Sequence, residues 1–149
     1  MEEQKYEALK LKNHLCFPLY ACSRETIRLY KPLLDELDLT YTQYITMLVL
    51  WERGASTVKE LGNALYLDSG TLTPLLKKLE SKGLLARNRS TEDERNLIVS
   101  LTPKGEAMKD QAVHIPGQMA KMVSLAPEDT LTLYRLLYKL LGRAEDAAY

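Results

Sequence analysis

The spacing of hydrophobic residues predicts that most of this chain is helical. Between about residues 6 and 37, apolar side chains such as Leu15, Leu19 and Leu34 recur at the spacing of one helix face. Pro18 interrupts this stretch, where it either kinks one helix or starts a second. A further helix is predicted from about residue 42 to residue 53.

The boundaries of that helix carry recognisable signals. Thr40 or Tyr41 stands near its start, and Gly54 follows its end. Ser or Thr at positions 56 and 57, followed by Glu60, is an N-cap signature for the next helix. The sequence therefore predicts two helices separated by a short turn.

A third helix of this region is the most regular in the chain. A break at residues 66–68 precedes it, and Asp68 or Ser69 can cap its first turn. Gly83 is expected to end it. Its apolar residues form an i, i+3, i+4, i+7 stripe that must face a core: Leu72, Leu75, Leu76 and Leu79.

After Gly83 the hydrophobic period changes from that of a helix to that of a strand. Residues 84–89 and 96–101 are predicted to be two strands, and the polar residues 90–95 to be the loop between them. The second-strand residues expected to point inward are Leu97, Val99 and Leu101. Pro103 then begins a helix that should break near Pro116-Gly117, and a last helix is expected from about residue 127 to residue 141.

The order helix, turn, capped helix, strand, charged loop, strand predicts a mainly α (α+β) fold. It is a winged helix-turn-helix, placed at residues 41–102 with its wing at 84–101. The competing interpretation is an all-helical adaptor with a small hairpin, whose lysines are merely solvated.

Composition limits the class of protein. The chain has 149 residues, 46% hydrophobic and 27% charged, which is typical of one soluble domain. No apolar run approaches the roughly 20 residues of a membrane span, and the charged first ten residues do not resemble a secretory signal. A cytoplasmic location without membrane contact is therefore expected.

Charge is unevenly distributed, although the net charge is zero. Residues 69–89 hold five basic side chains and only one acid, Glu80, which leaves +4. The basic residues are Lys77, Lys78, Lys82, Arg87 and Arg89. A local basic zone of this kind is the electrostatic footprint of nucleic-acid binding.

The face of the 69–82 helix opposite its leucines suits double-stranded operator DNA. Small hydroxyls near its start can approach base edges, and its lysines can neutralise phosphates. Arg95 in the loop is placed to enter an adjacent minor groove. The predicted DNA-binding residues are Ser69, Thr71, Thr73, Lys77, Lys78, Arg89, Asp93 and Arg95.

Three segments resemble the MarR family of regulators. Asp93-Glu94-Arg95 followed by Leu97–Thr102 resembles its wing signature. Tyr66–Leu79 resembles the recognition region of the OhrR/MgrA-type redox-sensing branch, and Leu15–Ala21 resembles that branch's reactive-cysteine segment. The likeness covers about residues 10 to 120.

The resemblance implies a homodimer held by terminal helices, expected within residues 1–37 and 103–149. It also implies a palindromic operator and repression relieved by oxidation. It identifies Cys16 as the sensing thiol and assigns Tyr30 and Tyr41, from the other subunit, as its hydrogen-bond donors. Independently of the resemblance, Tyr20 lies one helical turn after Cys16, and the chain has nine tyrosines but one phenylalanine.

The expected chemistry is attack of the Cys16 thiolate on an organic hydroperoxide, which yields a sulfenic acid. Two-cysteine members of the branch have a resolving cysteine near residues 119–123, but this chain has none there. A low-molecular-weight or protein thiol is therefore the expected partner after oxidation. Cys22, six residues along the same helix, is too far away to form a disulfide with Cys16.

Two other classes remain open. One is a MarR-like regulator released by a small phenolic or apolar ligand that binds a tyrosine-lined cleft, with Cys16 silent. The other is an enzyme such as a thiol peroxidase, against which the lack of a second nearby thiol, a general base or a cofactor motif counts. Two histidines and two cysteines without close spacing give no reason to expect a metal or cofactor.

Overall fold

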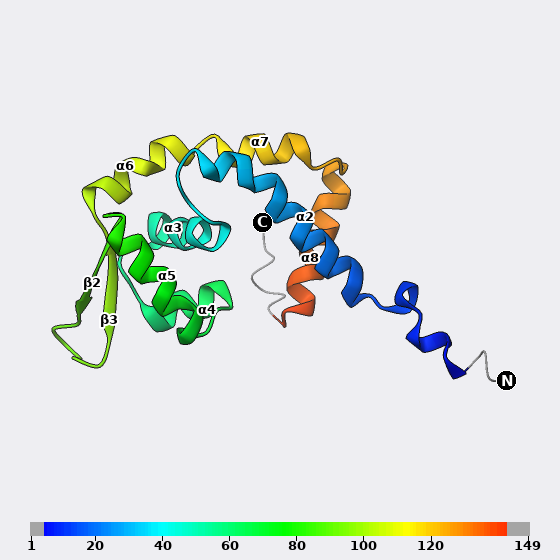
Figure 1. Cartoon of the computed structure of the whole chain (residues 1–149), viewed down its shortest axis with the longest axis horizontal. Coiled ribbons are helices and arrows are strands. Elements are labelled where there is room, and N and C mark those ends of the chain that lie inside the picture. The colour runs from blue at the N-terminus through cyan, green and yellow to red at the C-terminus, as the bar shows by residue number, and fades with distance from the viewer. Residues whose placement is uncertain (1–4, 143–149) are drawn as a thin grey trace. The chain divides into compact units, whose positions relative to one another are not determined.

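The computed structural model describes residues 5–142 and divides the chain after Ile115 into two compact units. The first unit contains the winged helix-turn-helix and the long helix that precedes it (Figure 1). The second contains the last two helices. Residues 1–4 and 143–149, which belong to the predicted dimerisation segments, lie outside the described residues.

The first long helix, α2, spans Cys16–Asp35 and starts later than its sequence pattern predicts. Before it, the chain forms two short 3-10 turns, η1 (Glu7–Leu9) and η2 (Leu11–Asn13). Of the two predicted roles for Pro18, the structure bears out a position at the start of a helix. Pro18 lies in the first turn, where a backbone N–H would have no intrahelical acceptor in any case.

Side-chain caps define the next three helices, as the sequence predicts. α3 (Tyr41–Arg53) and α4 (Val58–Leu65) each begin with a capping box, formed by Thr40 with Gln43 and by Thr57 with Glu60. α5 spans Ser69–Ser81 and is capped by Asp68. These local hydrogen bonds satisfy N–H groups that the helices themselves leave unpaired.

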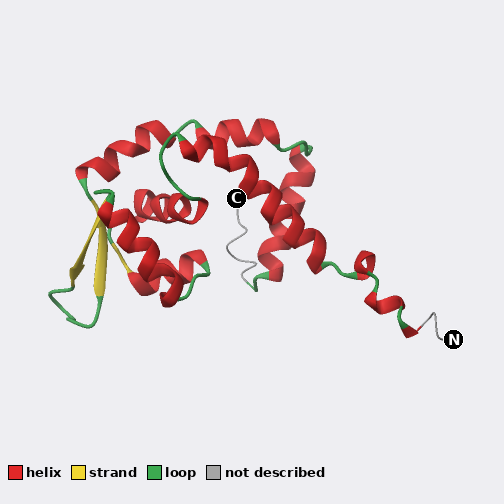
Figure 2. Ribbon diagram, viewed as in Figure 1, coloured by secondary structure: helices red, strands yellow, loops and turns green. Residues whose placement is uncertain are grey.

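A three-stranded antiparallel sheet has the strand order β1-β3-β2, with β1 before α4 in the chain and the other two strands after α5 (Figure 2). Its strands are β1 (Ser56–Thr57), β2 (Leu85–Arg89) and β3 (Leu97–Leu101). β1 was not predicted, because a two-residue strand shows no alternation of its own. Its identity depends on pairing with Val99 and Ile98.

The inward face of β3 differs from the prediction at one residue. Val99 is fully buried and Leu101 is half-buried, but Leu97 is 38% exposed. Leu97 pairs with Arg89 at the open end of the wing, beyond the reach of the core. The period-2 pattern is therefore correct, while the core is shorter than the strand.

The core of the first unit lies between α3, α5 and the sheet. All four leucines of the α5 stripe are buried, together with Met47 and Leu50 of α3. α6 (Pro103–Ala112) closes this body, since the Trp51 indole N–H donates to the Gly105 carbonyl at 3.0 Å. The leucine face of α5 is thus hidden, which leaves its other face for a ligand.

The second unit consists of most of α7 (Ile115–Met122) and α8 (Pro127–Leu140). The break expected at Pro116-Gly117 occurs instead at residues 113–114, because Pro116 is accommodated in the first turn of α7. α8 buries no residue along its length. Within residues 5–142, no helix is long and apolar enough to cross a bilayer.

Candidate nucleic-acid interface and thiol site

The outward face of α5 carries the side chains that the sequence assigns to DNA. Ser69, Thr71, Thr73, Lys77 and Lys78 are all exposed. The Asp68 carboxylate accepts the Thr71 N–H at 2.7 Å, and the Thr73 hydroxyl donates to the Ser69 carbonyl at 2.8 Å. The first turn of α5 is therefore held rigidly by its own polar side chains.

A hollow of about 440 Å³ lies where α4, α5 and the wing meet. It brings together three of the predicted DNA-binding residues: Ser69, Thr73 and Arg95. The other five predicted residues are not among those that line it. Lys59, Asn63 and Arg87 also line the hollow, and the DNA-binding prediction had not included them. The position of Lys59 and Asn63 on the first helix of a helix-turn-helix, which crosses the DNA backbone, is the signal that could have found them.

The tip of the wing is ordered by two of its own side chains. The Ser90 hydroxyl accepts the N–H groups of Glu92 and Asp93, at 3.2 and 3.4 Å. The Asp93 carboxylate accepts the Arg95 N–H at 3.0 Å and the Asn96 side-chain amide at 3.4 Å. Asp93 thus holds the loop that presents Arg95. The sequence had predicted that Asp93 contacts DNA.

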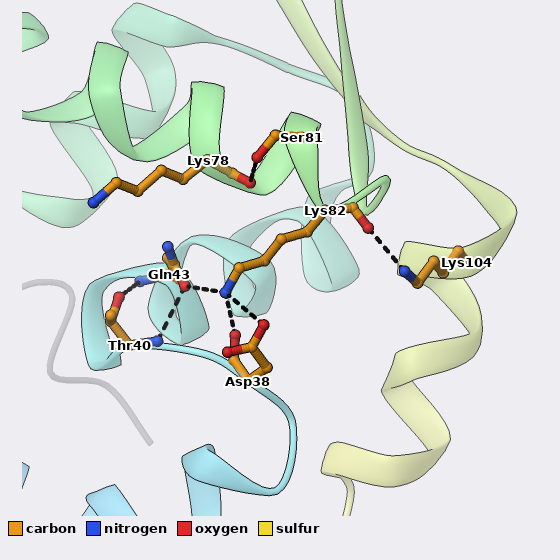
Figure 3. A network of polar contacts seen from close by, with 7 residues as sticks. All are labelled: Asp38, Thr40, Gln43, Lys78, Ser81, Lys82 and Lys104. Carbon is orange, nitrogen blue, oxygen red and sulfur yellow. Dashed lines mark hydrogen bonds and ion pairs between the residues drawn. The ribbon is translucent and has the colours of Figure 1, made fainter.

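Two of the five basic side chains in the basic zone form ion pairs with acidic residues of the same chain. Arg87 forms an ion pair with Glu80 at 3.2 Å, and its side-chain hydrogen bond holds the pKa of that carboxyl below its usual value. Lys82 points toward Asp38 and Gln43 (Figure 3). The remaining cations of the zone, Lys77, Lys78 and Arg89, are exposed.

Cys16 is the first residue of α2, and its side chain is exposed in the single chain. A helix N-terminus attracts negative charge, so the position suits a nucleophile that reacts as a thiolate. Tyr20 lies one turn further on, where its hydroxyl accepts a hydrogen bond from Arg24 at 3.1 Å. Cys22 is also exposed and unpaired.

Tyr30 and Tyr41, which the resemblance assigns to the thiol of the other subunit, lie side by side in one chain. Their ring centroids are 5.0 Å apart, and Tyr44 joins them at 5.7 Å from Tyr30. Burial raises the pKa of Tyr30 and of Tyr41, and raises that of Tyr44 to about 12. All three phenols therefore remain protonated hydrogen-bond donors at neutral pH.

The cluster Tyr30–Tyr41–Tyr44 is far from the thiol of the same chain. Tyr30 follows Cys16 by 14 residues on the uninterrupted helix α2, a rise of about 21 Å. A single chain therefore does not bring the thiol and the tyrosines together. Tyr44 was missed by the sequence reasoning, although its position one turn after Tyr41 could have revealed it.

Within residues 5–142, no group of three or more histidine, cysteine, aspartate or glutamate side chains is arranged to hold a metal ion. The hollow beside Tyr41, lined also by Ile27, Leu34 and Leu39, has a volume of about 250 Å³. Small-molecule sites usually measure about 300–1,000 Å³. The hollow beside Tyr41 in one chain is thus smaller than a usual small-molecule site.

The chain is similar in sequence and in fold to known transcriptional regulators. The family model "Transcriptional regulator SarA/Rot" matches residues 28–112. The organic hydroperoxide resistance transcriptional regulator of Bacillus subtilis (strain 168) is 52% identical over 139 residues, which cover 93% of this chain and 95% of the relative.

Solved structures agree with these sequence matches. AbfR is a protein of Staphylococcus epidermidis, and its structure in the overoxidized state bound to DNA resembles this chain. The two sequences are 34% identical, and the TM-score is 0.75 over 93% of this chain and 97% of AbfR. The reduced form of MarR from E. coli is 30% identical, with a TM-score of 0.71 over 86% and 96% of the two chains. The chain therefore belongs to the MarR family, within which it is a redox-sensing transcriptional regulator and not an enzyme.

Proposed function

We propose that the protein is a homodimeric repressor that binds palindromic operator DNA and releases it when an organic hydroperoxide oxidises Cys16. The observation that carries this proposal is the placement of the exposed Cys16 thiol about 21 Å along α2 from Tyr30, which lies half-buried beside Tyr41. Only a second copy of the chain can supply the Tyr30 and Tyr41 hydroxyls to that thiol.

The exposed apolar surface supports self-association. Leu15, Phe17 and Tyr20 surround the start of α2 with exposed fractions of 66%, 44% and 57%. Leu136 and Leu140 of α8 are 54% and 63% exposed. Apolar surface of this extent is characteristic of an interface between chains.

The proposed reaction transfers one oxygen atom to sulfur. The Cys16 thiolate attacks the terminal oxygen of the hydroperoxide, so that an S–O bond forms and the O–O bond breaks. The sulfur becomes a sulfenic acid, and the departing alkoxide takes up a proton to give an alcohol. A low-molecular-weight thiol can then condense with the sulfenic acid and release water, which leaves a mixed disulfide. The apolar side chains around Cys16 favour an organic hydroperoxide over hydrogen peroxide.

Intramolecular resolution by Cys22 is excluded by the helix. The two cysteines are six residues apart on α2, about 9 Å along its axis, which exceeds the span of a disulfide. We therefore expect that a thiol from outside the chain condenses with the sulfenic acid. Release of DNA would follow if oxidation changed the distance between the two recognition helices, which a palindromic operator requires to be near one DNA turn, about 34 Å.

The decisive experiment measures operator binding and the mass of Cys16 together, before and after one equivalent of organic hydroperoxide. AbfR has been solved on DNA in both reduced and overoxidized states, so binding must be related to the measured state of the sulfur. We expect the wild type and Cys22→Ser to release DNA as the sulfenic acid or mixed disulfide forms. Cys16→Ser should bind normally and ignore the peroxide.

Release by a small ligand is the alternative that this experiment addresses. If Cys16→Ser still releases DNA on treatment with the hydroperoxide, the thiol is not the sensor. A phenolic or apolar ligand would then be the effector, and direct binding to the reduced protein would be the next measurement.

A further inference from the structure

Lys82 lies at the end of the recognition helix, but its side chain points into the protein. Its ammonium donates to the backbone carbonyl of Asp38 and lies 3.3 Å from the Asp38 carboxylate and 3.4 Å from the Gln43 side-chain oxygen (Figure 3). The side chain of Lys82 is only 29% exposed. Lys82 therefore joins the C-terminus of α5 to the turn between α2 and α3.

The acceptor on Asp38 is held in a fixed relation to α2. Asp38 adopts a left-handed conformation, with φ of 53°. The N–H groups on either side of it, of Leu37 and Leu39, both donate to the Leu34 carbonyl at 3.0 Å. Leu34, Leu37 and Leu39 are buried. A displacement of the last turn of α2 must therefore move the Asp38 carbonyl with it.

The other end of the link belongs to α5. The Lys82 N–H donates to the Lys78 carbonyl at 3.1 Å, and its own carbonyl accepts the Lys104 ammonium at 2.9 Å. α5 has 13 residues, so its DNA-facing first turn lies about 20 Å from this end. A rigid helix transmits movement of one end to the other.

We propose that Lys82 is a positioning residue that couples the sensing helix α2 to the recognition helix α5. Cys16 is the first residue of α2, and the Asp38 turn follows its last residues. Lys82 provides a direct polar link from that turn to α5. This inference rests on the proposed function, because it needs oxidation of Cys16 to displace α2.

The backbone carbonyl, and not the carboxylate, is the important acceptor. The Asp38 side chain is 89% exposed, and ion pairs in water contribute little. The hydrogen bond from Lys82 to the Asp38 carbonyl is held in place by the buried residues on either side of Asp38. Asp38→Asn should therefore preserve coupling, since it retains the carbonyl and since asparagine tolerates a left-handed conformation. Lys82→Met should remove coupling, because it keeps the apolar stem and deletes the donor.

The test compares the operator affinity of the full-length reduced and peroxide-treated proteins over a range of salt concentrations. The ratio of the two dissociation constants measures coupling. In Lys82→Met we expect the reduced affinity and its salt slope to match the wild type, while the ratio falls at least about fivefold. Lys82→Arg, whose guanidinium can donate to the same acceptors, should restore most of the ratio.

Lys77→Met is the matched control, because Lys77 is exposed on the DNA-facing side of the same helix. It should flatten the salt slope by about 0.9 and leave the ratio unchanged. If Lys82→Met flattens the slope in the same way, Lys82 contacts phosphate and the inference is wrong. An unchanged ratio in Lys82→Met would also overturn it.

The wild-type arm separates this inference from the proposed function. If peroxide does not release the wild type, the proposed function fails and the coupling role fails with it. If the wild type and Lys82→Met are released equally, only the coupling role fails. Thermal unfolding of each variant reports folding, and Lys82→Gln, whose shorter amide does not reach Asp38, replaces Lys82→Met if that variant is unfolded.

Discussion

Two regions of the molecule differ in how much of their apolar surface is buried within the chain. One is the winged helix-turn-helix at residues 41–102, called here the reading body, and the other consists of the helices α2 and α8. In the reading body, α3, α4 and α5 each have a side-chain cap, and α5 buries its whole leucine stripe. Along its 20 residues α2 buries only Leu34, and α8 buries none. The fold of the reading body is accounted for by contacts within one chain, whereas the sensing and self-association that we propose need a second copy.

This difference shows which exposed surfaces point to a ligand and which point to a partner chain. A capped, buried element explains its own stability, so its exposed polar face can be assigned to a ligand. An element with a bare apolar face has no such explanation within the chain. Substitutions in the two regions should therefore affect different properties.

The largest effect is expected at the bare face of α8. Leu136→Glu combined with Leu140→Glu should abolish self-association, because each leucine that is buried contributes roughly 1.5–3 kcal/mol. Sedimentation velocity measures the mass, and Thr130→Glu is the polar control, because Thr130 is exposed and lies about 120° around the same helix from Leu136. A double variant that still sediments as a dimer would show that α8 does not form the interface.

A loss of folding stability is expected instead at the edge of the reading body. A Cβ at Gly105 would lie 1.9 Å from the Leu84 carbonyl oxygen, so Gly105→Ala should cost about 3 kcal/mol of unfolding free energy. Gly117→Ala is the control, since a Cβ there meets nothing within 4 Å. Denaturant unfolding measures both, and equal stabilities would contradict the close packing.

The rate of oxidation should respond to the tyrosine cluster. Tyr30→Phe removes a hydroxyl while retaining the ring, and a hydrogen bond to a charged group contributes roughly 1.5–3 kcal/mol. Oxidation of Cys16 at neutral pH should slow about tenfold or more, as followed by mass spectrometry under limiting hydroperoxide. Tyr6→Phe, outside the cluster, should react like the wild type. An unchanged oxidation rate in Tyr30→Phe would show that the Tyr30 hydroxyl does not stabilise the Cys16 thiolate.

Operator affinity should fall when the wing loses its arginine. Arg95→Ala is expected to cost about 1–3 kcal/mol in DNA binding, with no change in thermal stability because Arg95 is exposed. Glu94→Ala in the same loop is the control. Normal binding by a folded Arg95→Ala dimer would remove this residue from the contact set.

The smallest effect is expected from a single phosphate contact. Lys77→Ala should weaken binding to all DNA sequences alike and lower the salt slope by about 0.9. Lys109→Ala on α6 serves as the control, because Lys109 is exposed but lies outside the basic zone. Equal slopes for the wild type and Lys77→Ala would mean that this face of α5 does not meet DNA.

The sequence by itself determined the features whose causes are local. The capping pairs Thr57 with Glu60 and Asp68 with Thr71 span three residues, so they can be recognised in any structural context. The 3.6-residue stripe in α5 and the helix-ending glycines are local as well. These signals sufficed to predict the winged helix-turn-helix and the exposed face of α5.

Only the tertiary structure decided which charges are free and which short segments pair. Lys82 and Arg87 counted equally with Lys77 in the sequence, yet Lys82 binds a residue 44 positions away and Arg87 pairs with Glu80. β1 exists only because β3 lies beside it. Such contacts depend on how distant segments pack, because the distance between two charges is set by the fold and not by their spacing in the chain.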